Sequence, residues 1–311
     1  MKRFVYNVLL FSLLATCVVA LLTALLGGNG RLRNVKYHLG VGDYSAWRLR
    51  EAGKTHDVDV LFIGSSHAYR TFDPRFYAEK GLSVFNLGSS NQTPLQTEML
   101  LRTYLDNLNP RLVVMEVHPD VMCLDGVESS IFLANHMGPS FEVARMAFAV
   151  GNVKSVLSMV YSASHNSFSS ELSHFEESTA DTANIYISGG YVERVGGTYS
   201  PCPHPTSTLD FSARQMRSLR AIVRLLKRRG VPCLLVEVPD TKVLRESYEN
   251  YDQFVTQMEK MGDFRPLRLD ALDDSLHFYN DNHLNQAGVD LLEVYFYDSV
   301  LYPYMQEKQI R

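Results

Sequence analysis

Two short segments far apart in the chain carry residue types that suit chemistry on acyl esters. The first is Gly64-Ser65-Ser66-His67, which directly follows the apolar run 58–63. A serine hydroxyl on a tight turn after a strand can act as an acyl nucleophile, because backbone N–H groups of the turn can stabilise an oxyanion. A serine in such a turn also commonly caps a helix or closes the turn. The tetrapeptide alone leaves both interpretations open.

The second segment, Asn280-Asp281-Asn282-His283-Leu284-Asn285, contains a candidate base for that serine. His283 can accept a serine proton, and Asp281, two positions earlier, can orient the imidazole or settle its tautomer. The alternative is that Asp281 or Asn285 caps the helix that follows and His283 is an ordinary loop residue. An Asp-x-His pattern in isolation favours that second interpretation.

The sequence between these segments predicts the elements that position them. Short apolar stretches predict buried parallel strands at 58–63, 83–87, 112–117 and 231–238, with a weaker one at 266–269. Helical patterns lie at 93–108, 209–229, 242–261 and 286–301. Strands that alternate with helices predict a three-layer α/β sheet with right-handed crossovers. Ser66 would follow the carboxyl end of the first strand, where ligands of such sheets bind.

The N-terminal segment predicts a membrane anchor. Lys2 and Arg3 precede an uncharged, almost wholly apolar run from about Val8 to Leu26, which can cross a hydrocarbon core of roughly 30 Å as a helix. The apolar regions of cleaved signal peptides are shorter, usually about 7 to 15 residues, so retention is favoured over cleavage. The cations before the span predict a cytoplasmic N-terminus and an exported body, although basic residues after the span weaken the asymmetry.

Beyond this signal anchor, assigned to residues 1–27, the composition changes twice. Residues 28–56 are mixed and begin with Gly28-Asn29-Gly30, so a linker with a flexible start is expected there. Residues 57–311 form the folded domain, interrupted at about 120–205 by a stretch rich in Ser, Asn, His and Gly. That stretch is too long for an ordinary connection and predicts an insertion.

Composition argues against several other functions. The 311 residues are 46% hydrophobic and 21% charged, which is typical of a globular protein. The formal net charge of -4 provides no basic surface for a phosphate backbone, so no nucleic-acid partner is expected. Candidate ligands lack the spacing of metal sites and no phosphate-binding glycine loop is present, so neither a metal nor a cofactor is expected. Three cysteines outside the anchor would permit one disulfide in an exported compartment, with the pairing open.

Together the two segments resemble those of the SGNH (GDSL-like) hydrolase superfamily, in which a serine block after the first strand pairs with a histidine block before the last helix. The likeness covers about residues 58–304, apart from the insertion. The blocks at 64–67, 86–91 and 281–285 look more narrowly like the membrane-tethered, DltD-like and alginate-acetyltransferase-like branches. The resemblance implies a three-layer α/β/α flavodoxin-like fold with a central, mostly parallel five-stranded sheet.

The resemblance also implies roles for particular residues. Ser66 becomes the nucleophile, His283 the base and Asp281 the residue that holds the imidazole. The N–H groups of Ser66 and Gly88 become the oxyanion donors, and the side chain of Asn91 is a further candidate donor.

Two departures from the superfamily pattern affect these roles. Many members place an aspartate three positions before the histidine, where this sequence has Asn280. Either Asp281 serves instead, as in the acetyltransferase-like branch, or Ser66 and His283 act as a dyad. The Gly-x-Asn-Asp block after the third strand is also missing, and Glu116-Val117-His118-Pro119 stands there. DltD-like members resemble this sequence in lacking that asparagine.

Three further polar residues border the predicted site. His67 follows the nucleophile and could fix the turn or contact a leaving group, while His118 could bind substrate or support the structure. Glu116 alternates with apolar neighbours, and a buried carboxylate there would require a partner such as Arg70 or Arg102.

The combined expectation is an envelope serine esterase or O-acyltransferase that acts on acyl esters of a cell-surface carbohydrate or polymer. One helix would anchor it in the cytoplasmic membrane, with the catalytic domain on the exported side. Hydrolysis and transfer differ only in the acceptor, and the resemblance implies a multipass membrane protein as acyl donor. The alternative is a non-catalytic member of the fold that binds or assembles a polymer through the insertion.

Overall fold

The computed structural model describes residues 1–27, 32–40 and 43–310 and divides the chain into two compact units. One unit consists of Met1–Val41 and Val127–Glu176, and the other consists of Gly42–Gly126 and Glu177–Arg311. The Gly28-Asn29-Gly30 segment, expected as a flexible exit from the membrane, lies outside the described residues.

The second unit is built on a five-stranded sheet in the order β2-β1-β3-β6-β7. Its strands are β1 (Val60–Ile63), β2 (Val84–Asn86), β3 (Leu112–Glu116), β6 (Cys233–Glu237) and β7 (Asp263–Pro266). All four neighbouring pairs are parallel. This is the strand order of flavodoxin-like sheets, whose ligand crevice opens where the order reverses, between β1 and β3. The expected α/β fold class is confirmed.

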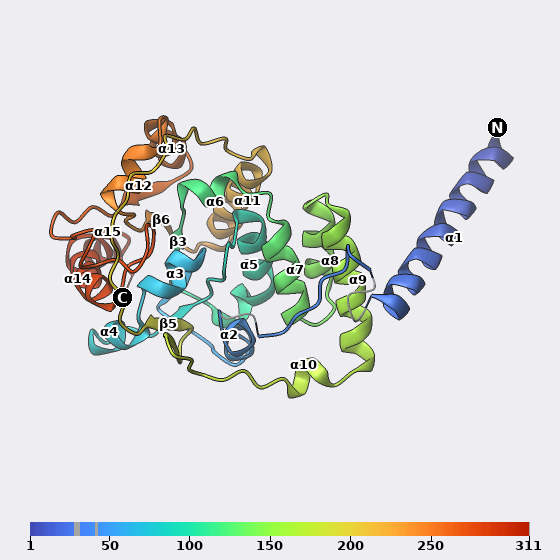
Figure 1. Cartoon of the computed structure of the whole chain (residues 1–311), viewed down its shortest axis with the longest axis horizontal. Helices are drawn as coiled ribbons and strands as arrows, with labels where there is room; N and C mark the ends of the chain where they lie inside the picture. The colour runs from blue at the N-terminus through green and yellow to red at the C-terminus, as the bar shows by residue number, and fades with distance from the viewer. Residues whose placement is uncertain (28–31, 41–42, 311) are drawn as a thin grey trace. The chain divides into compact units, whose positions relative to one another are not determined.

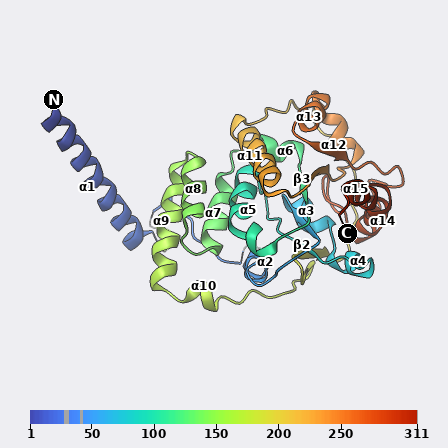
Figure 2. The ribbon, with the colours of Figure 1, turned by 180° about the vertical axis from the view of Figure 1, so that it is seen from behind.

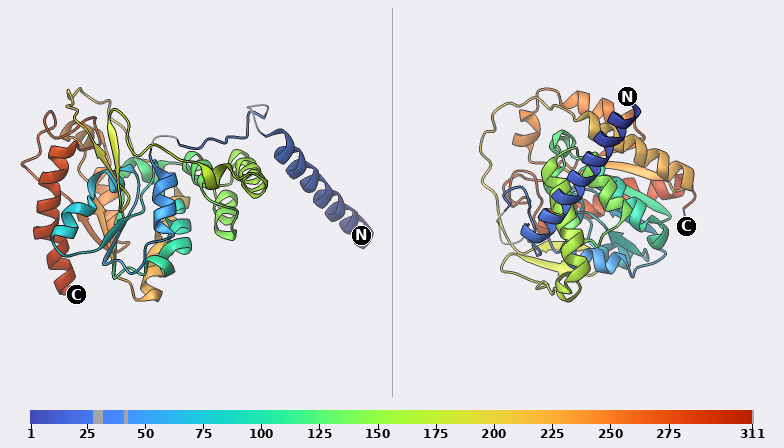
Figure 3. Two further views of the ribbon diagram at one scale, coloured as in Figure 1. Left: turned by 90° about the horizontal axis from the view of Figure 1, so that it is seen from below. Right: turned by 90° about the vertical axis from the view of Figure 1, so that its right-hand side faces the viewer.

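Helices cover both faces of this sheet, so its central strands are buried on both sides. Figure 3 shows α14 (Gln286–Phe296) on one side of the strands, with α2 (Ser45–Ala52) and α5 (Pro94–Leu108) on the other. Seen from behind in Figure 2, α11 (Ala213–Arg229) packs beside α5. Residues 60–63 of β1 are fully buried, which explains why the strand carries an unbroken apolar run.

Short helices occupy the connections of this unit. They are α3 (Ser66–Thr71), α4 (Pro74–Glu79), α6 (Pro119–Cys123), α12 (Lys242–Ser247), α13 (Tyr251–Glu259) and α15 (Tyr302–Glu307), the last preceded by the π-helical turn Tyr297–Leu301. The helix expected over 242–261 is therefore two helices. Tyr248 interrupts it, because its backbone pairs with Ser207 and its hydroxyl donates to Asp120 at 2.8 Å. The fifth strand begins three residues earlier than its apolar pattern indicates.

Part of the segment expected as a linker, residues 28–56, is helical in the structure. Residues 45–52 form α2, and Arg48 within this helix is fully buried. Its Nε donates to the carbonyl of Gly190 at 2.9 Å. Gly190 lies in the turn of the antiparallel hairpin formed by β4 (Asn184–Ile187) and β5 (Tyr191–Arg194). This tertiary contact, and not an apolar periodicity, makes the segment part of the folded unit.

The regular secondary structure of the first unit is helical in its described residues. Its helices are α1 (Lys2–Leu26), α7 (Val127–His136), α8 (Phe141–Ala149), α9 (Val153–Phe168) and α10 (Glu171–His174). Helices α7, α8 and α9 pack together (Figure 1), and the end of α1 contacts α9 where Gly27 meets the ring of Tyr161. Of the insertion expected at about 120–205, residues 127–176 group with α1, whereas residues 177–205 belong to the unit with the sheet.

Helix α1 is long and apolar enough to cross a membrane. Most of its side chains are exposed, including large apolar ones such as Phe4 and Phe11, and protein contacts with α9 are made at its C-terminal end. All four cysteines of the chain are free.

Candidate active site

The turn that follows β1 gives its two serines different contacts. Ser65 is the N-cap residue of α3, and its Oγ accepts the backbone N–H of His67 at 3.3 Å. The hydroxyl of Ser65 in turn donates to Oε2 of Glu116 at 2.8 Å. Ser66 begins the helix, is half-buried and makes no capping bond. The capping interpretation therefore applies to Ser65, and Ser66 keeps its hydroxyl available.

Close packing at Gly64 holds this turn against β3. A Cβ at Gly64 would lie 2.5 Å from Oε2 and 2.7 Å from Cβ of Glu116, so only glycine fits. Glu116 is buried and accepts both the backbone N–H and the hydroxyl of Ser65, at 2.7 and 2.8 Å. Burial raises the pKa of this carboxyl group. The expected partner, Arg70 or Arg102, does not pair with it, and Glu116 instead positions the turn.

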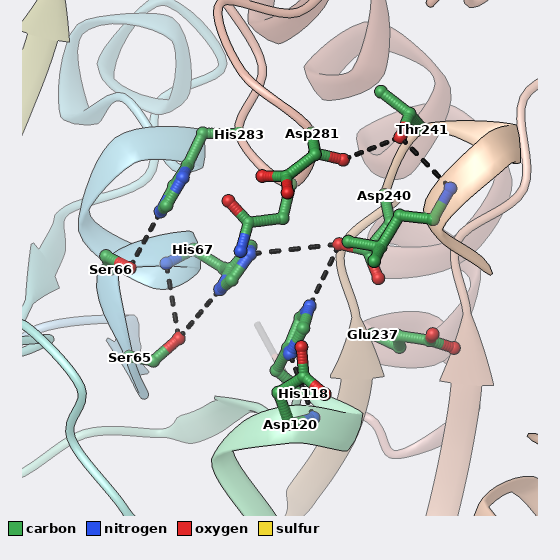
Figure 4. Close-up of polar contacts among 12 residues, drawn as sticks. Ser65, Ser66, His67, His118, Asp120, Glu237, Asp240, Thr241, Asp281 and His283 are labelled. Carbon is green, nitrogen blue, oxygen red and sulfur yellow. Dashed lines mark hydrogen bonds and ion pairs between the residues drawn. The ribbon is translucent and has the colours of Figure 1, made fainter. Parts of the chain in front are cut away.

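His283 lies opposite Ser66, on the loop that precedes α14. Its Nε2 is 2.7 Å from Oγ of Ser66 (Figure 4), although 217 positions separate the two residues in the chain. This distance is within the range for direct proton transfer between a nucleophile and its base. The sheet thus brings together the two residues that the sequence nominates.

The side chain next to the other imidazole nitrogen belongs to Asn280. Its Oδ1 lies 3.2 Å from Nδ1 of His283 and accepts the backbone N–H groups of Asn282 and His283 at 3.2 and 2.8 Å. These two backbone bonds fix the amide with its oxygen toward the ring. Oδ1 can therefore accept a hydrogen bond from Nδ1–H, which leaves the lone pair of Nε2 directed at Ser66. A general base needs this tautomer.

The structure does not place Asp281 at the imidazole, so the expected role for this residue is corrected. Its backbone carbonyl accepts the N–H and the hydroxyl of Thr241, at 3.0 and 2.8 Å (Figure 4). Its carboxylate lies 3.7 Å from Nε2 of His204. The turn at 280–283 directs the side chain of Asn280, three positions before His283, toward the imidazole ring. Many superfamily members carry aspartate at this position.

The two expected backbone donors for the oxyanion, Ser66 and Gly88, differ in whether another group accepts their N–H. The N–H of Ser66 stands at the first position of α3, where no carbonyl of its own helix can accept it. The N–H of Gly88 donates to Oδ1 of Asn86 at 3.1 Å, so it is already used. Gly88 serves packing, because a Cβ there would lie 2.9 Å from the carbonyl of Ser65. Asn91 is exposed at a φ of 50° and makes no hydrogen bond to Ser66 or His283 in the described part of the chain.

Three imidazole rings form a stack behind the candidate nucleophile. The ring of His67 packs on His283 with centroids 4.6 Å apart and on His118 with centroids 4.1 Å apart. His118 lies 2.9 Å, through Nε2, from Oδ1 of Asp240, and its Nδ1 accepts the backbone N–H of Asp120. Nδ1 of His67 contacts the hydroxyl of Ser65 at 2.9 Å. His67 and His118 are buried, so they support His283 and the turn and do not face open solvent.

His67, His118 and Asp240 form a candidate metal site, which the geometry of the stacked rings tests. Their ligand atoms lie within 4.8 Å of one another and all three side chains are buried. A metal sits about 2.0 to 2.1 Å from an imidazole nitrogen, in the plane of the ring. The two rings are nearly parallel, at 13°, with centroids 4.1 Å apart, so one ion cannot lie in both planes. This arrangement does not suit joint ligation by the two histidines.

Charge and burial make His283 a base that stays neutral at ordinary pH. Burial and the positive charges of Arg70 and His118 lower the pKa of His283 to about 3. Burial also holds the pKa of its neighbour His67 well below the usual histidine value. An unprotonated imidazole is therefore available to Ser66 across the neutral and mildly acidic range.

Replacing Asn280 by aspartate should move the acidic limb of the activity profile. In Asn280→Asp a carboxylate faces Nδ1, which favours the imidazolium, so the pKa of His283 rises. Because protonated His283 cannot accept the serine proton, the acidic limb of kcat/KM is expected to shift upward by roughly 1 to 3 pH units. Asn152→Asp, which exchanges one acceptor for another at the N-cap of α9, is the matched control. An unchanged acidic limb in Asn280→Asp would show that this side chain does not act on the base.

Asp240 and Asn280 contact the histidines of the site, although no role is expected for either side chain from the sequence alone. Asp240 follows β6 by three residues, at the sheet edge where Ser66 and His118 also lie, and that position could have nominated it. Glu237, which ends β6 at the same edge, bonds Arg268 and Tyr251 instead. Asn280 could have been found from its spacing of three residues to His283.

Comparison with known proteins identifies no relative by sequence. No family model matches the chain, and no curated protein matches it. Among solved structures, a protein of Bacteroides fragilis provisionally described as an acylhydrolase is 12% identical, with a TM-score of 0.39, over 89% of this chain and 100% of that one. A Streptococcus pneumoniae protein provisionally described as a platelet activating factor is 11% identical, with a TM-score of 0.40, over 82% of this chain and 94% of that one. Such distant likeness carries no functional argument, so the chemistry rests on the geometry of the site.

Proposed function

We propose that the chain is a serine esterase or O-acyltransferase of the SGNH type that acts on acyl esters of a cell-surface carbohydrate or polymer. The observation that carries the proposal is the 2.7 Å contact between Oγ of Ser66 and Nε2 of His283. It joins a free hydroxyl at the carboxyl edge of the sheet to a neutral base whose tautomer is held by Asn280.

In this mechanism Ser66 attacks the ester carbonyl while His283 takes the hydroxyl proton. The N–H of Ser66 supports the oxyanion, and His283 returns the proton to the leaving alcohol as the tetrahedral intermediate collapses. Water or a sugar hydroxyl then attacks the acyl-serine, again with His283 as base. Asn280 carries no charge, so it fixes the ring without the electrostatic support that an aspartate gives the imidazolium.

The length and apolar composition of α1 support action at a membrane. We propose that α1 anchors the chain in the cytoplasmic membrane and that the sheet-containing unit works on the exported side, because Lys2 and Arg3 precede the span. A multipass membrane protein that supplies the acyl group is a proposed partner, motivated by the resemblance to tethered transferases.

Surface polymer from cells that carry either the wild-type chain or Ser66→Ala tests this function. Ester-linked acyl groups are released by mild alkali and quantified on the purified polysaccharide. We expect the acyl content to differ between the two strains, rising in Ser66→Ala for an esterase and falling for a transferase. Equal content at equal protein levels would contradict the proposal and favour a non-catalytic polymer-binding module.

A further inference from the structure

Two arginines flank the aromatic ring that packs on the candidate base. The ring of Tyr279 lies against His283, with centroids 5.5 Å apart and planes at 16°. The guanidinium of Arg194 lies 4.8 Å from the centre of the same tyrosine ring, and that of Arg70 lies 5.7 Å from it. Two positive charges therefore lie beside the ring of Tyr279, which itself packs on His283.

The backbone explains this convergence. Arg70 follows Ser66 by four positions in α3, so both side chains lie on one face of the helix. Arg194 ends β5, where it pairs in register with Asn184 of β4. Nη1 of Arg70 donates to Oδ1 of Asn184 at 3.0 Å. The hairpin thus carries Arg194 to the side of the nucleophile on which Arg70 stands.

Neither guanidinium has a carboxylate partner among the described residues. The side-chain hydrogen bonds of Arg70 go to uncharged groups, the amide of Asn184 and the phenol of Tyr69, and Nε of Arg194 is buried without any hydrogen-bond partner. Arg75 and Arg268 of the same unit, by contrast, both form ion pairs with carboxylates. The negative charge of Asp43 also acts on Arg70. The carboxylate of Asp43, however, accepts the backbone N–H groups of residues 45 and 90.

We propose that Arg70 and Arg194 form a subsite for an anionic group, a carboxylate or phosphate, carried by the acylated substrate next to its ester. Guanidinium groups recognise both anions through paired hydrogen bonds, and unused donors at the edge of a site are suited to them. This inference rests on the proposed function and narrows its substrate to acidic carbohydrate or phosphate-bearing polymer.

Binding of an anion at this subsite also changes the basicity of His283. Burial and the charge of Arg70 together lower the pKa of His283, so an anion bound at Arg70 offsets part of that effect. The base then becomes a better proton acceptor when an anionic substrate is in place. A neutral ester lacks this benefit.

Matched acetyl esters test the subsite by kcat/KM. The substrates are an O-acetylated hexuronate, an O-acetylated hexose phosphate and an O-acetylated neutral hexose, and the full chain is used in detergent. We expect the wild type to prefer one or both anionic esters, and Arg70→Gln and Arg194→Gln to lower the anionic-to-neutral ratio by roughly 10- to 100-fold. Using the ratio cancels the change in the base that Arg70→Gln causes equally for both kinds of ester. Arg220→Gln, on the exposed face of α11, should leave the ratio unchanged.

The hexuronate and the hexose phosphate distinguish the two sources of negative charge. A ratio that is the same in the wild type, Arg70→Gln and Arg194→Gln overturns the subsite.

Binding of glucuronate and inorganic phosphate to Ser66→Ala, measured by calorimetry, separates this inference from the proposed function. Binding that Arg194→Gln abolishes supports the subsite even if no ester is cleaved, whereas no binding of either anion in that case overturns it.

Discussion

Ser66→Ala is expected to lower kcat/KM for ester cleavage by at least about 10³-fold, because it removes the hydroxyl that contacts the base. Ser65 cannot replace it, since its own hydroxyl donates to Glu116. The measurement is the initial rate with an activated acetyl ester, on protein whose circular dichroism matches the wild type. Ser173→Ala, at an exposed serine of α10, provides the matched control.

The double variant sharpens this prediction. If Ser66 and His283 act as one unit, Ser66→Ala with His283→Gln should be no slower than either single variant. Multiplicative losses, or a Ser66→Ala enzyme that keeps most of its rate, would mean that the 2.7 Å contact is not the reacting pair.

Gly64→Ala is expected to damage both stability and rate. The added Cβ would overlap Cβ and Oε2 of Glu116, at 2.7 and 2.5 Å, so β1 and β3 must separate or Glu116 must move. The free energy of unfolding should fall by about 2 to 4 kcal/mol, from overpacking and from a backbone conformation that suits glycine. Because Glu116 holds the turn, the displacement of Ser66 should lower kcat by roughly 100-fold.

Urea denaturation and steady-state kinetics measure these two effects. Gly262→Ala is the matched control, because a Cβ at Gly262 meets no atom within 4 Å. If Gly64→Ala behaves like Gly262→Ala in both experiments, the turn is not held in place by its packing against Glu116.

The sequence predicts the sheet well because its strands are buried on both faces. Four of the five apolar runs match strands at the expected places, since both faces of β1, β3 and β6 lie under helices. The fifth strand, at the edge of the sheet, is less apolar and begins three residues early. The helix over 242–261 breaks at Tyr248, whose contacts with distant residues outweigh local helical preference.

At the site, the sequence nominates the nucleophile and base segments but misplaces the residue that orients the ring. Asp-x-His suggests Asp281, yet the turn directs Asn280 to Nδ1, and only the backbone bonds of that turn show it. Gly88 illustrates a second limit. The resemblance implies that its N–H is an oxyanion donor, and it does not reveal that Oδ1 of Asn86, two residues earlier, accepts that N–H in the structure.

The contacts of His67, Arg70 and Arg194 are tertiary, so no local pattern could predict them. His67 and His118 lie 51 positions apart in the chain, yet their rings stack because β1 and β3 are neighbours in the sheet. Arg194 reaches the site through a hairpin within a segment that the sequence treats only as an insertion.

The most direct test of the central claim is labelling with a fluorophosphonate probe, followed by mass spectrometry of the digested protein. A neutral base 2.7 Å from the hydroxyl predicts one covalent adduct on Ser66. The adduct should be absent from Ser66→Ala and from denatured protein, and strongly reduced in His283→Gln. A folded wild-type protein that takes up no probe at Ser66, or that labels equally well as Ser66→Ala, would contradict the account.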